Sequence, residues 1–392
     1  MDKRRVLALS AAAVFVFGAC SSGATPTPAS QTPASIGPSI AASGGTESQP
    51  PPSSAAAAAT VRLQLQWAPQ AQFAGYFAAL DKGYYSEEGL DVTILPGAVD
   101  IVPATVVAGG KAEFGISWVP RMLAPRESGA DVQVIGQVFQ RSATTQVAFK
   151  TSGITSVADF KGKKIGSWGF GNEFELLAGM RKAGLDPDKD VTVVPQQFDM
   201  NAFVGGQIDA AQAMTYNEYA QVLETKNPKT GQLFTAADLN VIKWEDQGTS
   251  MLQDAIFTSE AWLAKAGNED IAVKFLKASF RGWAFCRDSA AECVDIVVKH
   301  DAKLPKGHQT WMLNEVNALI WPSPNGIGIM DQAAFDRTVK ISVDSKVLKA
   351  APTGKAFRND LAQKALDALG STVDTKGASW QKQAVTLTEG GK

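Results

Sequence analysis

The most constraining feature of this sequence is an alternation of short strand patterns and helical patterns that runs from residue 61 to residue 138. The same rhythm starts again at residue 165. Strand patterns that alternate with helical patterns favour parallel or mostly parallel sheets covered by helices. With 392 residues, the chain is long enough for two compact lobes. The sequence therefore predicts an α/β protein with two lobes.

The C-terminal third carries a different pattern. From about residue 257 onward the chain becomes helical and amphipathic, and no strand rhythm continues. One helix face collects the apolar side chains Ile271, Ala272, Phe275, Leu276, Phe280 and Trp283. We expect a helical C-terminal part packed on the α/β lobes.

The first 60 residues predict export and a tether. Lys3, Arg4 and Arg5 precede an apolar stretch at 6–17, as in a signal peptide of residues 1–19. The residues that end in Cys20 resemble a bacterial lipobox, which implies lipidation of Cys20; an ordinary secretory signal is the alternative. Residues 20–60, rich in Ser, Ala, Thr and Pro, then predict a disordered tether. We expect an extracytoplasmic protein held on the bacterial cell membrane by a lipid anchor.

Charge and apolar content exclude two classes. Lys and Arg total 37 against 39 Asp and Glu, so the formal net charge is −2 and no basic surface for nucleic acid is expected. After the signal no apolar run is long enough to predict a transmembrane helix.

Two cysteines remain in the folded part, Cys286 and Cys293. On one unbroken helix this spacing separates them by about 10 Å, too far for a disulfide. Asp288 and Ser289 lie between them and are typical of a helix end and a new N-cap, where a turn would bring the two sulfurs together. An oxidising compartment permits the bond. Both arrangements remain open.

The usual catalytic motifs are missing. Histidine occurs only at His300 and His308, without a metal-binding spacing, so we expect neither a metal site nor a cofactor. No G-x-S-x-G sequence supplies a hydrolase nucleophile. A glycine-rich turn occurs at Gly166, Gly169 and Gly171, but the last glycine of a dinucleotide-binding G-x-G-x-x-G pattern would fall at Phe174. The sequence predicts that the protein is not an enzyme.

Aromatic and polar side chains gather where the predicted strands end. In open α/β sheets ligands bind beyond the carboxyl ends of the strands, so these residues are candidate ligand-binding residues. Aromatic faces stack on flat rings, and amides and carboxylates pair with ring N–H groups. Taken singly, Trp67 and Trp118 fit a hydrophobic core as well. The candidates are Trp67, Gln72, Phe73, Tyr76, Trp118, Trp168, Asn172, Glu173, Tyr216, Asn217 and Glu218.

Several segments between residues 61 and 330 resemble one family. They are W-A-P-Q-A-Q-F-A-G-Y (67–76), K-G-Y-Y-S-E-E-G-L-D-V (82–92), D-F-K-G-K-K-I-G (159–166), G-Q-I-D-A-A (206–211) and M-T-Y-N-E-Y (214–219). They resemble the thiamine-pyrimidine-precursor-binding family of ABC transporter substrate-binding lipoproteins, which has riboflavin-binding relatives.

The resemblance implies a two-lobed periplasmic-binding-protein fold of the second type. Lobe one would comprise residues 61–150 and 252–390, and lobe two residues 151–251. The protein would act as a monomer, close on a small heterocyclic ligand such as hydroxymethylpyrimidine or formylaminopyrimidine, and deliver it to ABC permease and ATPase subunits. By position, Trp67 would line the first lobe and Trp168, Asn172, Glu173, Tyr216 and Glu218 the second.

Alternatives remain. Riboflavin would need a wider cleft with stacking on both ring faces, and a sulfonate or nitrate would need basic groups or helix N-termini. A pyrimidine-synthase-like enzyme shares the expected fold but depends on a cysteine- and histidine-rich iron motif. A structural or adhesive lipoprotein would need no cleft.

Overall fold

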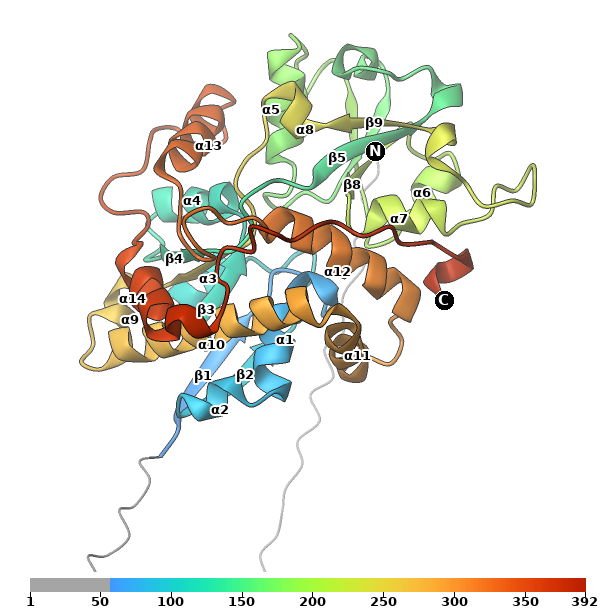
Figure 1. Ribbon diagram of the computed structural model, residues 1–392. Coiled ribbons are helices and arrows are strands. Elements are labelled where there is room, and N and C mark those ends of the chain that lie inside the picture. The colour runs from blue at the N-terminus through green and yellow to red at the C-terminus, as the bar shows by residue number, and fades with distance from the viewer. Residues whose placement is uncertain (1–56) are drawn as a thin grey trace, which may run out of the picture. The chain divides into compact units, whose positions relative to one another are not determined.

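The computed structural model describes residues 57–392 (Figure 1). The signal peptide of residues 1–19, the lipidation at Cys20 and almost all of the tether of residues 20–60 lie outside these described residues. The described chain forms one compact unit that contains two five-stranded sheets. We call the sheet that holds residue 61 and its surroundings the first lobe, and the other sheet with its surroundings the second lobe.

The first sheet has the strand order β2-β1-β3-β10-β4. Its strands are β1 (Ala59–Gln64), β2 (Leu90–Leu95), β3 (Phe114–Ser117), β4 (Gln133–Gln137) and β10 (Ala255–Thr258). The pairs β1–β2 and β1–β3 are parallel, whereas β10 runs antiparallel to β3 and to β4. Val61, Leu63 and Leu65 are fully buried, as the alternation in β1 requires.

The second sheet has the strand order β7-β6-β8-β5-β9. Its strands are β5 (Thr144–Phe149), β6 (Lys164–Ser167), β7 (Thr192–Pro195), β8 (Ala210–Met214) and β9 (Leu239–Lys243). The strands β6, β7 and β8 are parallel, and β5 runs antiparallel to β8 and β9. Each sheet is thus mostly parallel, with one reversed strand.

The reversed strands are those by which the chain changes lobe. It passes from β4 into β5, and it returns from β9 to β10. The predicted boundary at residue 150 is wrong, because β5 pairs with β8 and β9 in the second sheet. The chain enters the second lobe near residue 143. The strand β5 escaped prediction because no α-helix separates it from β6, so it does not follow the strand–helix alternation.

Helices surround both sheets. Those of the α/β lobes are α1 (Ala74–Asp81), α2 (Tyr84–Glu87), α3 (Pro103–Ala108), α4 (Val119–Glu127), α5 (Phe174–Lys182), α6 (Asn201–Val204), α7 (Glu218–Leu223), α8 (Trp244–Gln247) and α9 (Glu260–Leu263). The C-terminal part adds α10 (Asn268–Asp288), α11 (Ala290–His300), α12 (Lys306–Ile320), α13 (Gln332–Asp344) and α14 (Asp360–Leu369). Within the described residues no helix is both long enough and apolar enough to cross a bilayer.

The long helix α10 packs closely on α1. Two glycines permit this approach: a Cβ on Gly75 would lie 2.2 Å from the Trp283 ring, and one on Gly282 would lie 2.0 Å from the Gly75 carbonyl oxygen. The predicted apolar face of α10, including Phe275 and Phe280, is buried. The helical C-terminal part therefore completes the core of the first lobe.

The C-terminal part also contacts the second lobe. Helix α12 contacts α7, and α13 contacts both α4 and α5. The last residues run along α12 toward α7 (Figure 1), where Lys226 pairs with Glu389 at 2.6 Å and the Gly390 amide donates to the Glu224 carbonyl. The C-terminal tail thus forms a contact between the lobes in addition to the two segments by which the chain crosses from one lobe to the other.

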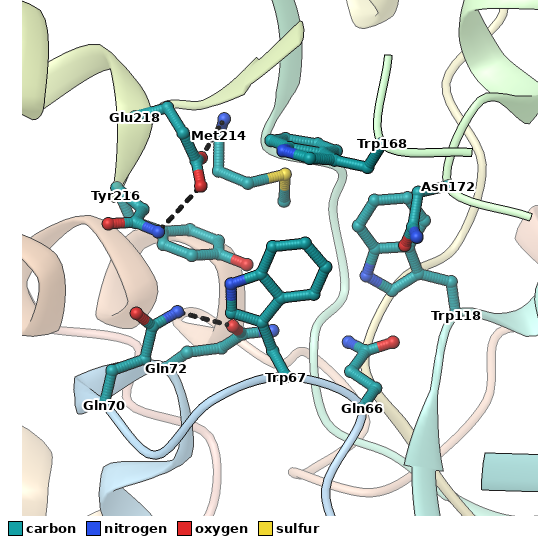
Figure 2. Close-up of a pocket in the computed structure, with 11 residues that line it drawn as sticks. Gln66, Trp67, Gln70, Gln72, Trp118, Trp168, Asn172, Met214, Tyr216 and Glu218 are labelled. Atoms are coloured by element: carbon teal, nitrogen blue, oxygen red, sulfur yellow. Dashed lines mark hydrogen bonds between the residues drawn. The ribbon is translucent and has the colours of Figure 1, made fainter. Parts of the chain in front are cut away.

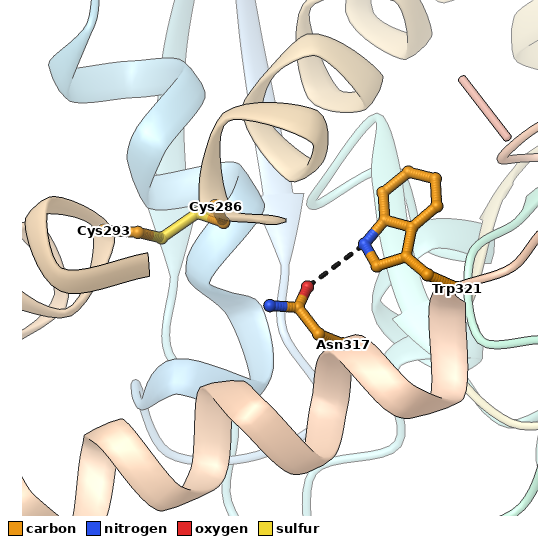
Figure 3. Close-up of a disulfide and its surroundings, with 4 residues drawn as sticks. All are labelled: Cys286, Cys293, Asn317 and Trp321. Carbon is orange, nitrogen blue, oxygen red and sulfur yellow. Dashed lines mark hydrogen bonds between the residues drawn. A yellow bond between two sulfur atoms is a disulfide. The ribbon is translucent and has the colours of Figure 1, made fainter. Parts of the chain in front are cut away.

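A disulfide joins Cys286 on α10 to Cys293 on α11 (Figure 3). The helical conformation is interrupted at Ser289, which has φ −130° and ψ 53°. The turn there brings the Cα atoms of Cys286 and Cys293 to 5.1 Å from each other. Of the two arrangements that the spacing left open, the turn is the one observed. Ser289 holds the N-cap position as predicted, but its side chain makes no capping hydrogen bond.

Candidate functional site

A cavity lies between the two lobes (Figure 2). Both sheets contribute to its wall, which combines aromatic rings with side-chain amides. The lining residues are Gln66, Trp67, Gln70, Gln72, Trp118, Trp168, Asn172, Met214, Tyr216, Asn217 and Glu218.

The strand ends deliver these side chains. Gln66 and Trp67 follow β1, and Trp118 follows β3, so all three lie at the carboxyl edge of the first sheet. Trp168 follows β6 and Tyr216 follows β8 at the same edge of the second sheet. Because parallel strands end together at one edge, side chains distant in sequence meet there.

Aromatic contacts close the cavity from both lobes. The Trp67 ring of the first lobe meets the Trp168 ring of the second edge-to-face, with centroids 5.7 Å apart. Phe198, also from the second lobe, lies edge-to-face on Trp67 at 4.5 Å. In Figure 2 the Trp67 indole stands in the centre, with Trp118 and Trp168 on one side and Tyr216 on the other. This arrangement offers several aromatic surfaces to a flat ring.

A buried carboxylate organises the first-lobe wall. Asp254, which directly precedes β10, accepts hydrogen bonds from the Gln66 amide at 2.5 Å, the Gln72 amide at 2.9 Å and the Trp118 indole N–H at 3.0 Å. Burial raises the pKa of Asp254 to about 6. The three donors partly compensate for that burial, and they fix the orientation of three cavity side chains.

A second carboxylate lines the cavity from the other lobe. Glu218 at the start of α7 accepts from the Met214 amide at 3.0 Å and from the Asn217 side chain at 2.8 Å (Figure 2). Burial raises the pKa of Glu218 to about 7. At neutral pH this group therefore exchanges readily between the charged and the neutral form.

A histidine joins the lobes beside the cavity. His308 on α12 contacts the Glu224 carboxylate through Nδ1 at 2.9 Å and the Asn217 side-chain oxygen through Nε2 at 2.9 Å. Both His308 and Glu224 are buried. Since Asn217 also lines the cavity, this contact between lobes is connected directly to the binding wall.

Comparisons with known proteins place the chain in a family. The family model described as NMT1/THI5 like matches residues 70–292, which is more than half of the sequence. The chain belongs to the NMT1/THI5-like family. The resemblance that the sequence motifs indicated is thereby confirmed.

The curated relatives of this chain carry names with different ligands or activities. The riboflavin-binding protein RibY of Chloroflexus aurantiacus is 27% identical over 92% of this chain and 98% of its own length. The formylaminopyrimidine-binding protein of Halalkalibacterium halodurans is 22% identical over 61% of this chain and 70% of its own. A shorter match, 33% identical over 34% of this chain and 42% of the other, is to 4-amino-5-hydroxymethyl-2-methylpyrimidine phosphate synthase of Legionella pneumophila.

The fold has a solved counterpart. The alkanesulfonate-binding protein SsuA of Xanthomonas axonopodis, bound to MOPS, superposes with a TM-score of 0.58, at 17% identity, over 78% of this chain and 100% of the other. The predicted two-lobed periplasmic-binding-protein fold is confirmed.

Most of the predicted site residues of this NMT1/THI5-like chain lie together. Trp67, Gln72, Trp118, Trp168, Asn172, Tyr216, Asn217 and Glu218 line the cavity. Three others do not. Phe73 and Tyr76 are buried in the first-lobe core, where Tyr76 packs edge-to-face on Trp283 at 5.6 Å. The Glu173 carboxylate turns back to its own loop and accepts from the Gly171 amide at 2.9 Å.

Asn172 lines the cavity and does not cap helix α5. Helix α5 begins at Phe174 with Glu173 at its N-cap, and no side chain caps it. The Asn172 amide instead donates to the Gly169 carbonyl at 2.8 Å. Gly169, Phe170 and Gly171 all have positive φ, so the two glycines serve a tight turn.

Four functional side chains escaped prediction. Gln66, Gln70 and Met214 line the cavity, and Asp254 orients its wall. Gln66 directly precedes the candidate Trp67, and Met214 lies two residues before the candidate Tyr216, so both were available signals. No sequence signal pointed to Asp254. Strand β10 runs antiparallel to β3, with Ala255 paired to Ser117, so the amino end of β10 lies at the edge where the parallel strands have their carboxyl ends. Asp254, which directly precedes β10, therefore lies at the cavity.

Proposed function

We propose that this chain is the extracytoplasmic ligand-binding component of an ABC importer, and that its cargo is a thiamine pyrimidine precursor of the hydroxymethylpyrimidine or formylaminopyrimidine type. Its relatives support the coarser role of a ligand-binding component of an import system. One observation carries the choice of cargo: aromatic rings, amides and the Glu218 carboxylate line one cavity between the lobes.

The lining favours an uncharged or weakly cationic ring. Among the described residues that line the cavity there is no Lys, Arg or His. The buried Arg121 does not line the cavity; its Nε and Nη2 donate to the carbonyls of Phe170 and Ile101, and its Nη1 has no hydrogen-bond partner among the described residues. A sulfonate or nitrate would meet the carboxylate of Glu218 without a facing cation. We therefore do not favour the sulfonate or nitrate alternative.

The shape of the cavity wall favours a single ring. The Trp67 and Trp168 rings lie edge-to-face with centroids 5.7 Å apart, which leaves little width for a fused ring system. The Glu218 carboxylate suits the exocyclic amine of an aminopyrimidine.

Riboflavin is the second candidate, because a riboflavin-binding protein is related to this chain over nearly the full length of both. A flavin has three fused rings and would need the contact between the Trp67 and Trp168 rings, whose centroids lie 5.7 Å apart, to open. The pyrimidine ring of a flavin presents the same kind of N–H and carbonyl groups to the amides.

The cysteines and histidines that an iron-dependent pyrimidine synthase would need as metal ligands make other contacts in this chain. Cys286 and Cys293 form the disulfide, His308 binds Glu224, and His300 binds Asp81 at 2.8 Å. Within residues 57–392 no three His, Cys, Asp or Glu side chains converge as metal ligands. We propose a binding protein without its own catalysis; iron-dependent turnover by the pure protein would contradict this.

Delivery follows from the two-lobed fold. A ligand that touches both lobes stabilises the closed form by its differential affinity, and the closed form is what a permease can recognise. We propose that residues 1–19 direct export, that a lipid on Cys20 and the tether to residue 60 hold the monomeric protein at the membrane, and that permease and ATPase subunits take over the ligand.

A thermal-shift screen tests the cargo. The protein is purified through an unfolding step, so that no ligand is carried over, and is mixed with hydroxymethylpyrimidine, formylaminopyrimidine, thiamine, riboflavin, taurine or nitrate. Tight binding raises the melting temperature. A shift with the pyrimidines alone supports the proposal, and a shift with riboflavin alone supports the second candidate. A shift with taurine or nitrate contradicts both the pyrimidine and the riboflavin candidate. The absence of any shift, as expected for an adhesive lipoprotein, also contradicts both.

A further inference from the structure

A tight turn of the second lobe carries two cavity residues. Residues 169–171 lie between β6 and α5 and are flanked by Trp168 and Asn172, which both line the cavity. All three residues of the turn have positive φ, and Phe170 does so without being a glycine, at φ 53°. A left-handed conformation costs free energy at a non-glycine residue, so contacts with the surroundings must hold this turn.

The turn is held from both lobes. Within the second lobe, the Asn172 side chain donates to it and the Glu173 carboxylate accepts from it. From the first lobe, Nε of Arg121 on α4 donates to the Phe170 carbonyl at 2.9 Å. The Arg121 stem also packs closely on the turn, since a Cβ on Gly171 would lie 2.9 Å from Arg121 Cγ. Arg121 therefore contacts the turn by a hydrogen bond and by packing.

The Arg121 guanidinium is buried where the two lobes meet. The residue is 2% exposed, and burial lowers the pKa of Arg121 to about 10, although the Glu173 and Asp254 carboxylates favour the charged form. Arg121 is therefore charged at neutral pH. Its Nη2 donates to the Ile101 carbonyl at 2.8 Å, a contact within the first lobe. Only the contact with Phe170 joins this guanidinium to the backbone of the second lobe.

Closure of the lobes brings this donor and acceptor together. When the lobes of a binding protein separate, contacts between them are lost, and the hydrogen bond from Arg121 to Phe170 is lost with them. Closure restores the bond, and hydrogen bonds from charged donors are the stronger ones. The closed form thus gains a contact that also supports the turn between Trp168 and Asn172.

We propose that Arg121 is a positioning residue that couples closure to ligand binding: by binding the Phe170 carbonyl in the closed form, it holds the turn of residues 169–171 and keeps Trp168 and Asn172 in the cavity wall. Arg121 acts through the turn, because it does not itself line the cavity. The inference rests on the proposed function, since it needs a ligand on which the lobes close, and it applies to a pyrimidine and to a flavin alike.

Arg121→Met tests the proposal on the full-length protein, because methionine keeps an unbranched apolar stem and removes the guanidinium. Hydroxymethylpyrimidine and riboflavin are the probes. Calorimetric titration should show on the order of 10-fold weaker affinity, and stopped-flow displacement should assign most of the change to faster dissociation. The melting temperature of the ligand-free protein should stay within about 2 °C of the wild-type value, because the open form lacks the contact with Phe170. Unchanged affinity for the probe that the wild-type protein binds would overturn the inference.

Arg287→Met is the matched control. Arg287 is buried within the first lobe, its guanidinium donates to the Asp374 carbonyl at 2.6 Å, and it does not line the cavity. Because this contact lies within one lobe, its loss should lower the melting temperature of the ligand-free protein and leave the affinity unchanged. The same pattern in Arg121→Met, a lower melting temperature with unchanged affinity, would show a purely structural role and overturn the inference.

Phe170→Gly separates the carbonyl from the side chain. The variant keeps the carbonyl that Arg121 binds, and glycine adopts positive φ without strain, so its affinity should stay within about threefold of the wild-type value. The Phe170 ring that it removes is 59% exposed. A loss as large as that of Arg121→Met would assign the effect to this ring and overturn the inference. Failure of the wild-type protein to bind either probe would instead overturn the proposed function, and this inference with it.

Discussion

Trp67 of the first lobe and Trp168 of the second meet edge-to-face with ring centroids 5.7 Å apart. The two residues are separated by about 100 positions in the sequence, yet together they form part of one cavity wall. A ligand held against both rings must bridge the lobes. This contact therefore links binding to closure, and it leads to the first prediction.

Replacing Trp67 by alanine should weaken binding of the preferred ligand by about 1 to 3 kcal/mol, because one stacking surface is lost. Trp67→Phe keeps an aromatic face and should recover part of the loss. Calorimetric titration of both variants measures the effect. Unchanged affinity in Trp67→Ala would mean that Trp67 serves only the core.

Glu175 should make stability depend on pH. Its carboxylate is buried where the chain crosses between lobes and accepts from the Met251 amide at 2.5 Å and the Ser142 hydroxyl at 2.9 Å. Burial raises the pKa of Glu175 from 4.5 to about 8. The folded state thus holds a proton that the unfolded state releases, so this stabilisation is present below pH 4.5 and is lost as the pH rises through 8.

The size of this effect is about 5 kcal/mol from the two pKa values of Glu175. Denaturant unfolding of the wild-type protein and of Glu175→Gln, compared between pH 4 and pH 9, isolates it. The variant, which stays neutral, should gain stability relative to the wild-type protein as the pH rises. Parallel pH profiles for the two proteins would show that Glu175 titrates normally.

His308 should affect binding without touching the ligand. It holds Glu224 and Asn217 across the lobes, and removing one partner of a buried pair leaves the other uncompensated. His308→Asn should therefore weaken ligand affinity by about 1 to 2 kcal/mol, mainly through faster dissociation. Stopped-flow displacement measures the rate.

The matched control is His300→Asn. His300 pairs with Asp81 between α11 and α1, which both belong to the first lobe. Its replacement breaks a histidine–carboxylate contact without loosening the contact between lobes. If both variants lose affinity to the same extent, the effect is a general loss of stability and the bridging role of His308 is wrong.

The disulfide should contribute modestly to stability. The bond closes a short loop between Cys286 and Cys293, and a loop of this size is worth about 2 kcal/mol in the chain-entropy model. The double variant Cys286→Ala/Cys293→Ala should lose about that amount in denaturant unfolding. In a Cys20→Ser background, thiol titration without reductant should detect no free thiol; two thiols would contradict the bond.

Local sequence pattern specified most of the strands and helices and much of the site. The alternation in segments such as 61–65 specified strands, since period-two apolar residues bury only one face of a strand. Strand-end positions predicted Trp67, Trp118 and Trp168 as neighbours, because parallel strands end at one edge.

Long-range packing determines the remaining features. Asp254 reaches the cavity because β10 is reversed in the first sheet, and strand direction depends on pairing between segments more than 100 residues apart. Tyr76 lies in the core because α1 packs on Trp283. The closure of Cys286 on Cys293 required the actual backbone at Ser289. Local pattern sets which face of an element is apolar, whereas long-range packing decides what each side chain meets.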